Sequence, residues 1–220
     1  MRSKTKAGKS AASVAKPKAA KAAKVRSAGK KPAEVEETAQ VLSSEVVYAG
    51  DLFRVVHDKL IEPGGHENER EVVRHNGSAV ILAVDSSKSK KNPWVVMERQ
   101  YRHAAGRFLW EIPAGKVEPG EDLLAGAQRE LAEETGYRAK KWKTLAHYWA
   151  SPGFLDESMT LFLAEGLSVG DTNPDADERI DLRLVKLTEV MKMIDKGAIQ
   201  DGKTLIGILL YARLKLKGRK

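Results

Sequence analysis

Three glutamates are spaced so that a helix would place them on one side. Glu130, Glu133 and Glu134 stand at positions i, i+3 and i+4, which are neighbouring side-chain positions on an α-helix. Three carboxylates this close repel one another unless cations share the space. Carboxylate oxygens suit Mg²⁺ and Mn²⁺, which keep part of their water and also bind phosphate oxygens. The spacing therefore predicts a divalent-cation site suited to a phosphate-containing ligand.

Two neighbouring residues support such a site. Arg129 stands four residues before Glu133, so a salt bridge could hold that glutamate in position. Gly115 is expected to end a strand where the chain turns tightly, which would bring a backbone carbonyl close to an ion. An exposed acidic helix would explain the three glutamates alone. It does not explain the complete spacing, because seven fixed residues and two apolar positions would match by chance about once in a billion starting points.

The segment from Gly115 to Tyr137 resembles the Nudix box, Gly-x5-Glu-x7-Arg-Glu-U-x-Glu-Glu-x-Gly-U with U aliphatic or aromatic, and matches it at every position. The resemblance implies a Nudix hydrolase, which uses Mg²⁺ (Mn²⁺ is the alternative) to cleave nucleoside diphosphates linked to another group. It implies that Glu121 supports the loop or a metal-bound water. It implies two principal metal ligands and two assisting ones, the last a backbone carbonyl: Glu130, Glu134, Glu133 and Ala114.

Three flanking regions resemble the ADP-ribose pyrophosphatase branch of that family. They are residues 99–102 with 110–116, residues 151–157 with Pro152 fifteen residues after Tyr137, and residues 175–180. The resemblance covers about residues 45–215. It implies that water cleaves ADP-ribose to AMP and ribose 5-phosphate. Another nucleotide sugar such as GDP-mannose, or a dinucleotide polyphosphate, is the alternative substrate.

The same resemblance assigns roles to individual residues. Glu178 would be the catalytic base, with Asp177 and Glu157 as alternatives. The other two members of the catalytic group would be Glu133 and Arg129. Among the substrate contacts, Arg102 would be a forked donor to a phosphate, Glu157 would supply an acid, and Arg70 would lie near the terminal ribose. The rings of Tyr48 and Phe53 could stack on adenine or pack in the core.

The pattern around these residues predicts an α+β fold. Helices are expected at residues 122–135, 187–196 and 203–215, and the first should end at Gly136. Asn76-Gly77 is predicted to be the turn of a hairpin. Because no regular βαβ repeat occurs, a mixed sheet between helices is favoured. The expected strands are residues 46–48, 52–57, 71–74, 78–84, 94–101, 108–112, 142–150, 159–165 and 181–186.

The resemblance implies an α/β/α sandwich with a mixed sheet, preceded by a small N-terminal antiparallel sheet. We divide the chain into a Lys/Ala-rich tail at residues 1–40, the small sheet at 41–77 and a Nudix hydrolase domain at 78–220. In the ADP-ribose pyrophosphatase branch the small sheet is usually exchanged between subunits, so a homodimer with substrate sites at the interface is expected. The four tryptophans are expected to pack in the sheet, and the five histidines to be surface or loop residues.

The positive excess of the chain lies in residues 1–31. This segment holds eleven Lys and Arg and no acid, whereas the rest holds 27 basic and 30 acidic residues. Since few side chains in residues 1–40 could form a core, the whole tail is predicted to be disordered. Nonspecific contact of residues 1–31 with nucleic acid is one interpretation, and a solvated extension or an organelle transit sequence are the others. The rival function is a nucleic-acid-associated protein whose Nudix fold only senses a nucleotide.

The composition excludes several classes of protein. The absence of Cys excludes a disulfide scaffold, a thiolate zinc site and a cysteine nucleophile. No apolar run approaches the roughly 18 residues of a membrane span. The first residues lack the apolar core of a secretory signal. We therefore expect no membrane partner and a cytoplasmic location.

Overall fold

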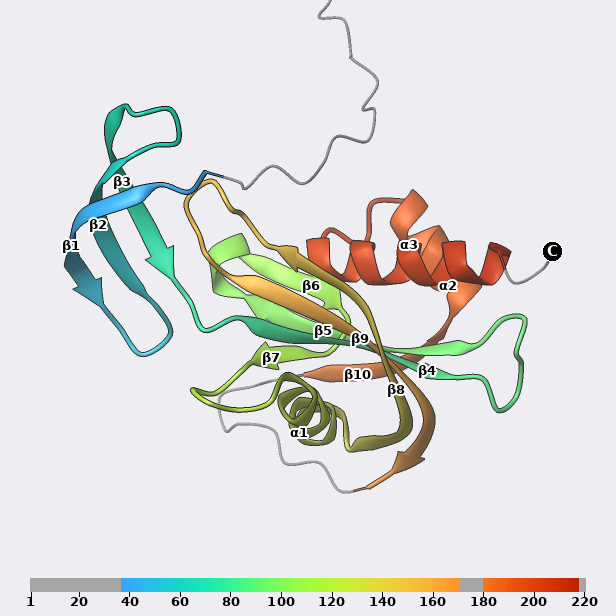
Figure 1. The fold of residues 1–220 in the computed structure, drawn as a ribbon. Helices are drawn as coiled ribbons and strands as arrows, with labels where there is room; N and C mark the ends of the chain where they lie inside the picture. Colours follow the sequence, from blue (N-terminus) through green and yellow to red (C-terminus); the bar gives the residue numbers. More distant parts are fainter. Residues whose placement is uncertain (1–36, 171–179, 218–220) are drawn as a thin grey trace, which may run out of the picture. The chain divides into compact units, whose positions relative to one another are not determined.

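The computed structural model describes residues 37–170 and 180–217. From Thr38 onward the chain forms one compact unit, which contains two sheets (Figure 1). The smaller sheet is antiparallel in the order β1-β2-β3, and it confirms the predicted N-terminal sheet. Its strands are longer than the sequence pattern indicates: β1 (Gln40–Ala49), β2 (Arg54–Ile61) and β3 (Glu67–Arg74).

The larger sheet is mixed and has strand β4 near its centre. β4 runs parallel to β9 and antiparallel to β5, in the order β10-β5-β4-β9-β8. Two short strands pair beside this path, β6 with β5 and β7 with β4. Seven of the eight β4 residues are buried, as expected for a strand covered on both faces. The strands are β4 (Ser78–Asp85), β5 (Trp94–Arg102), β6 (Arg107–Glu111), β7 (Ala114–Lys116), β8 (Tyr137–Trp149), β9 (Ser158–Val169) and β10 (Asp181–Lys186).

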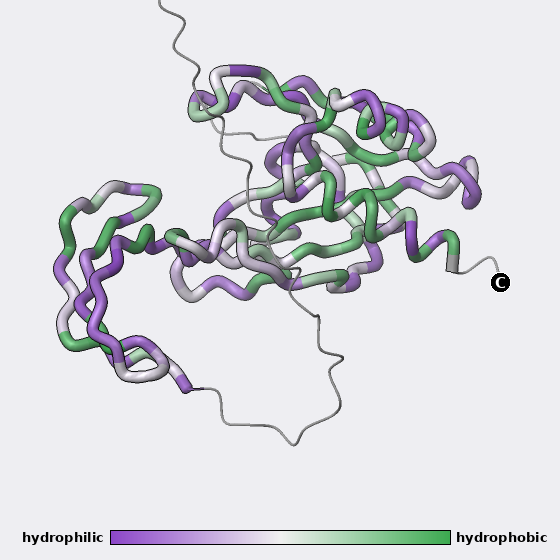
Figure 2. The backbone as a smooth tube through the Cα atoms, turned by 90° about the horizontal axis from the view of Figure 1, so that it is seen from above, coloured by the Kyte–Doolittle hydropathy of each residue, from purple (hydrophilic) through white to green (hydrophobic). Residues whose placement is uncertain are grey.

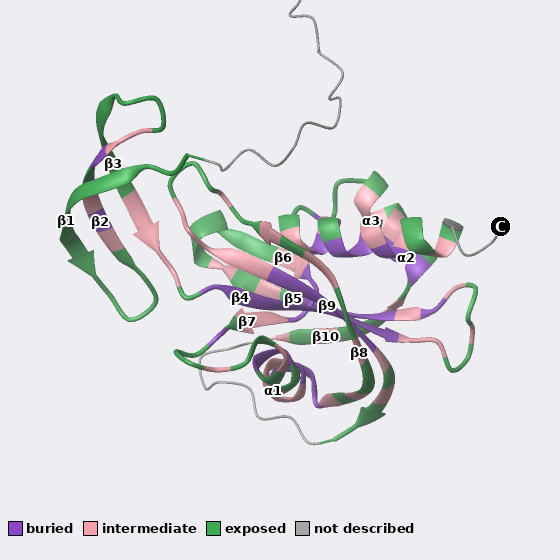
Figure 3. Ribbon diagram, in the orientation of Figure 1, coloured by how far each residue is buried: buried purple, intermediate pink, exposed green. Residues whose placement is uncertain are grey.

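Helices cover both faces of the larger sheet, with α1 on one face and α2 and α3 on the other (Figure 1). The β4 side chains alternate between the layers: Val80 and Leu82 pack toward α2 and α3, whereas Ala79 and Ile81 pack toward α1. Hydrophobic strands run through this centre (Figure 2), and burial is concentrated there (Figure 3). The predicted sandwich is therefore confirmed. The helices are η1 (His103–Ala105), α1 (Leu123–Thr135), α2 (Leu187–Asp195) and α3 (Gly202–Lys217).

Helix α1 begins and ends at the residues that the sequence indicates. The Asp122 carboxylate accepts hydrogen bonds from the backbone N–H groups of Leu124 and Ala125, both at 3.0 Å. At the other end Gly136 adopts a φ of 68° and donates its N–H to the Ala132 carbonyl. Both caps are local, which explains why the bounds of this helix could be predicted.

The predicted hairpin at Asn76-Gly77 is wrong. β3 pairs with β2 in the smaller sheet, whereas β4 pairs with β5, β7 and β9 in the larger one. Gly77 has a φ of 90° and donates its N–H to Nδ1 of His75 at 3.0 Å. The turn therefore carries the chain from one sheet to the other. The physical reason is the apolar run of β4, which can be buried on both faces only inside the larger sheet.

Two smaller features also differ from the sequence pattern. Strand β7 is missing from the prediction because three residues carry no periodicity. The prediction that Trp149 packs in the sheet is wrong, because 54% of its surface is exposed at the end of the edge strand β8. Within the described ranges, no helix combines the length and the apolar composition needed to cross a bilayer.

Candidate functional site

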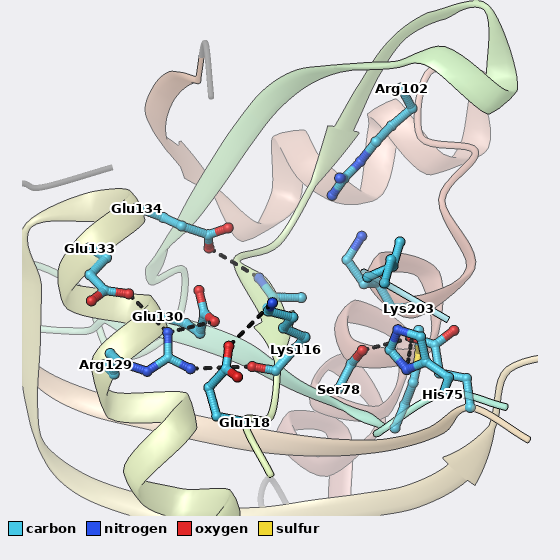
Figure 4. Close-up of a pocket in the computed structure, with 15 residues that line it drawn as sticks. His75, Ser78, Arg102, Lys116, Glu118, Arg129, Glu130, Glu133, Glu134 and Lys203 are labelled. Carbon is cyan, nitrogen blue, oxygen red and sulfur yellow. Dashed lines mark hydrogen bonds and ion pairs between the residues drawn. The ribbon is translucent and has the colours of Figure 1, made fainter. Parts of the chain in front are cut away.

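A cavity of about 650 Å³ brings together residues from six elements, namely β4, β5, β7, β9, α1 and α3, and from the loops that follow β1, β3, β7 and β8. Glutamates of α1 lie on one side of the cavity, and Arg102 and Lys203 lie on the other (Figure 4). His75 and Ser78 lie on the same side as Lys203 (Figure 4). The cavity therefore has an acidic wall and a basic wall.

Arg129 organises the acidic wall. Its Nε and Nη2 donate to the two carboxylate oxygens of Glu121, both at 3.0 Å. Its Nη1 donates to Glu130 at 2.8 Å and to Glu133 at 2.9 Å, and Nη2 also donates to the Lys116 carbonyl at 3.2 Å. These bonds use all five N–H donors of the guanidinium. The predicted salt bridge to Glu133 is confirmed, and Arg129 holds two further acids.

The charges on this wall support one another. Hydrogen bonding to Glu121 is the main reason why the pKa of Arg129 lies above its ordinary value. The same hydrogen bonds hold the pKa of Glu121 below its ordinary value. Arg129 therefore favours the ionised form of Glu121.

Gly115 is required for a different reason from the one expected. It lies inside β7, not at the end of a strand, and its φ is not positive. A Cβ atom built on it would lie 2.0 Å from Cδ of Glu130 and 2.2 and 2.3 Å from its two oxygens. The expectation of a tight turn is therefore wrong. Glycine is needed because the Glu130 carboxylate lies directly against the backbone.

Glu134 is buried at the same end of the cavity. Its Oε2 accepts a hydrogen bond from the backbone N–H of Ala114 at 3.2 Å, and its side chain lines the cavity beside Glu130. The first residue of β7 and the last turn of α1 are therefore joined directly.

A buried carboxylate organises the basic wall. Glu111, with 3% of its side chain exposed, accepts Nε and Nη2 of Arg102 at 2.9 and 2.8 Å and also contacts Nζ of Lys203. Burial raises the pKa of Glu111, but the hydrogen bonds and charges of both cations outweigh it, so the pKa lies below its ordinary value. Hydrogen bonding to Glu111 likewise raises the pKa of Arg102.

A third group of residues joins the two sheets beside the cavity. Ser78 Oγ donates to Glu157 Oε1 at 2.7 Å, and Nδ1 of His75 lies 3.9 Å from the same oxygen. The His75 side chain is 11% exposed and lines the cavity. His75 is a loop residue, as predicted, but the sequence does not indicate that it belongs to the site. Because its Nδ1 accepts the Gly77 N–H, its Nε2 is the donor nitrogen.

A family model described as "NUDIX domain" matches residues 74–206. This chain belongs to the Nudix family. The Nudix chain is 36% identical over 179 residues to the ADP-ribose pyrophosphatase of Bacillus subtilis (strain 168), a match covering 80% of this chain and 93% of that protein. It is also 36% identical over 171 residues to the methanol dehydrogenase activator of Bacillus methanolicus, covering 77% and 90%.

The likeness extends to a solved structure. A crystal structure of an ADP compounds hydrolase matches with a TM-score of 0.69 at 21% identity, covering 85% of this chain and 98% of that one. At that identity the match concerns the fold. Together with the family match, the relatives identify the chain as a Nudix-type pyrophosphohydrolase.

The glutamates of the Nudix box have the ligand chemistry that a divalent cation requires. Glu130 and Glu134 supply hard carboxylate oxygens to one cavity, and Gly115 leaves room for one of them against the backbone. Among residues 37–170 and 180–217, no three acidic or histidine side chains lie close enough together to hold a metal ion as they stand.

The other predicted site residues do not all lie at the cavity. Arg102 and Glu157 line the cavity with the box residues. Arg70 lies on β3 and pairs with Glu62 at 2.6 Å. Tyr48 and Phe53 are exposed, with ring centres 5.6 Å apart, and neither lines the cavity. The base candidates Asp177 and Glu178 and the tail at residues 1–31 lie outside the described residues.

Besides His75, two residues that build the basic wall are missing from the sequence prediction. Lys203 is the second residue of α3, and Glu111 is the last of β6. Glu111 stands in the segment Trp-Glu-Ile-Pro that resembles the ADP-ribose pyrophosphatase branch, which was the available signal. Lys203 has no local signal, because its partner lies 92 positions away along the chain.

Proposed function

We propose that this Nudix enzyme hydrolyses the pyrophosphate of ADP-ribose to AMP and ribose 5-phosphate. The observation that carries the proposal is the cavity in which Glu130 and Glu134 face Arg102. The charge of a bound pyrophosphate must be neutralised by cations, and the site must also supply the residues that bind metal cations. We choose ADP-ribose among the substrates of the Nudix family because a relative of this chain is named ADP-ribose pyrophosphatase.

The box residues of the chain have distinct roles in this proposal. Glu130 and Glu134, assisted by Glu133 and the Ala114 carbonyl, would hold Mg²⁺, with Mn²⁺ as the alternative. The ion would neutralise phosphate charge and lower the pKa of a bound water. Arg129 keeps the acids in place through its five hydrogen bonds.

The remaining groups of the cavity would bind and activate the reactants. Nη1 of Arg102 has no acceptor among the described residues, so it could donate to a phosphate oxygen. A carboxylate takes a proton from water while the water oxygen attacks one phosphorus and the bond to the bridging oxygen breaks. Glu178 is our first choice for this base. Glu157, an alternative, lines the cavity and is held by Ser78.

A homodimer is part of the proposal. All ten residues of β1 are exposed, and four aliphatic side chains contribute to this surface: Val41, Leu42, Val46 and Val47. Several exposed aliphatic side chains on one strand are typical of an interface. We propose that a second copy of the chain covers it, and that Tyr48, Phe53 and Arg70 reach the substrate from this sheet. A cytoplasmic location and contact of residues 1–31 with nucleic acid rest on the sequence alone.

A substrate panel tests the proposed reaction. The full chain is incubated with Mg²⁺ and ADP-ribose, GDP-mannose, UDP-glucose, NADH or a diadenosine polyphosphate, and the products are separated by chromatography. We expect a clear preference for ADP-ribose, with AMP and ribose 5-phosphate in equal amounts and no turnover in EDTA. Preference for another member would overturn the substrate, and inactivity on all would favour the nucleotide-sensing alternative.

A further inference from the structure

Lys203 occupies an unusual position for a lysine. Only 9% of its side chain is exposed, yet that side chain lines the cavity opposite the Nudix box glutamates (Figure 4). Its Nζ contacts the carboxylates of Glu111 and Asp201, the latter at 3.2 Å. Lysine is rarely buried to this extent without a functional or structural reason.

Neutralising Glu111 does not explain Lys203. The two oxygens of Glu111 are already paired with the forked guanidinium of Arg102, which balances its charge. Asp201 supplies a second carboxylate: its Oδ1 lies 3.2 Å from Nζ of Lys203, and its Oδ2 accepts from the backbone N–H and the hydroxyl of Thr204, at 2.9 and 2.6 Å. Two cations and two carboxylates therefore form one cluster, in which Arg102 and Lys203 line the cavity whereas Glu111 and Asp201 do not.

The donors of Lys203 and Arg102 are not all used within the protein. The ammonium group has three N–H donors, and the described part of the chain supplies acceptors at Glu111 and Asp201. Arg102 likewise uses Nε and Nη2 on Glu111, and Nη1 contacts no acceptor in the described ranges. Both side chains line the same cavity, so their remaining N–H donors are available to an anion there.

We propose that Lys203, held next to Arg102 by Glu111, forms a phosphate-binding subsite that accepts a phosphate group without the help of a metal ion. The inference deepens the proposed function, because such a subsite would hold one end of the pyrophosphate and afterwards a phosphomonoester product. Glu111 is then a positioning residue that brings two cations to one anion. Lys203 is the residue that specifies this subsite.

The test measures phosphate binding to the metal-free full chain. Inorganic phosphate is titrated into the protein in EDTA, and binding is followed through amide chemical shifts. Lys203→Met removes the charge and keeps the length of the side chain. Lys196→Met makes the same change at an exposed lysine that forms no ion pair with any described residue. We expect saturable binding by the wild type and by Lys196→Met. Lys203→Met should bind about tenfold to a hundredfold more weakly, because one charge-assisted hydrogen bond is lost.

A second measurement needs no folded variant. The side-chain nitrogen signal of Lys203 in the wild-type protein should shift on addition of phosphate, ribose 5-phosphate or AMP. Equal phosphate affinity in Lys203→Met and wild type, or a lysine signal that does not move, would overturn the inference. Because neither measurement needs Mg²⁺ or turnover, a positive result with an enzyme inactive on ADP-ribose would reject the proposed substrate and keep the subsite.

Discussion

Replacing Gly115 with alanine tests the site most directly. The added methyl group would lie 2.0 Å from Cδ of Glu130, whereas real Cβ contacts essentially never fall below 3.0 Å. The Glu130 carboxylate must therefore move by at least about 1 Å, against the hydrogen bond that Arg129 makes to it at 2.8 Å. A displacement of about 1 Å in a catalytic group can reduce the rate by roughly a hundredfold. We expect a loss of that order in kcat/KM.

The assay is ADP-ribose hydrolysis across a Mg²⁺ titration, with circular dichroism to check folding. Gly153→Ala is the matched control, because an added Cβ at Gly153 meets nothing within 4 Å and its φ is not positive. The control should keep wild-type activity, and Gly115→Ala should require more Mg²⁺ in addition to turning over more slowly. Wild-type kinetics in a folded Gly115→Ala protein would refute the assignment of Glu130 to the metal site.

Three further predictions follow from the same geometry. Glu134→Gln should lower kcat by two orders of magnitude or more and change the melting temperature by only a few degrees. The reason is that the lost carboxylate charge contributes more to metal binding and catalysis than the hydrogen bond to Ala114 contributes to stability. Near-normal turnover would contradict this role. Because the pKa of Glu111 is lowered in the folded state, its contribution to stability should be complete above its ordinary value of 4.5 and should be lost as the pH falls through the lower folded value. Melting curves from pH 7 to pH 3 should show a steeper acid decline for wild type than for Glu111→Gln, and parallel curves would argue against the effect. Replacing Val46 and Val47 with aspartate should convert the expected dimer to a monomer in sedimentation, whereas aspartate at the exposed Val169 should not; a wild-type monomer at micromolar concentration would remove the dimer from the proposal.

The parts of the molecule that the sequence predicts well are those governed by local interactions. Helix α1 follows from a helical period and a glycine at its end, both local signals, and the structure adds Asp122 as its N-cap. The glutamates that share one side of that helix do line one cavity. The Arg129 salt bridge to Glu133 is likewise an i,i+4 pair. Such features need no knowledge of the rest of the chain.

The features that the sequence does not predict depend on distant contacts. Asn76-Gly77 has the composition of a hairpin turn, but the burial of β4 decides its neighbours. The pair of Lys203 with Glu111 joins residues 92 positions apart. The close approach of Glu130 to Gly115 depends on how α1 packs over β7. In each case the local pattern has two solutions, and tertiary packing selects one.

The alternation of side chains along β4 has a consequence for how this enzyme can change over time. The layer beneath α1 is filled partly by alanines, at positions 79, 83, 127 and 164, whereas the layer beneath α2 and α3 is filled mostly by larger aliphatic groups. Exchanges of similar volume in the second layer leave the box glutamates where they are. One larger side chain in the thin layer lifts the helix that carries them. The distance of the box glutamates from the sheet therefore depends in part on small side chains in this layer, and exchange of these for larger ones should be tolerated least.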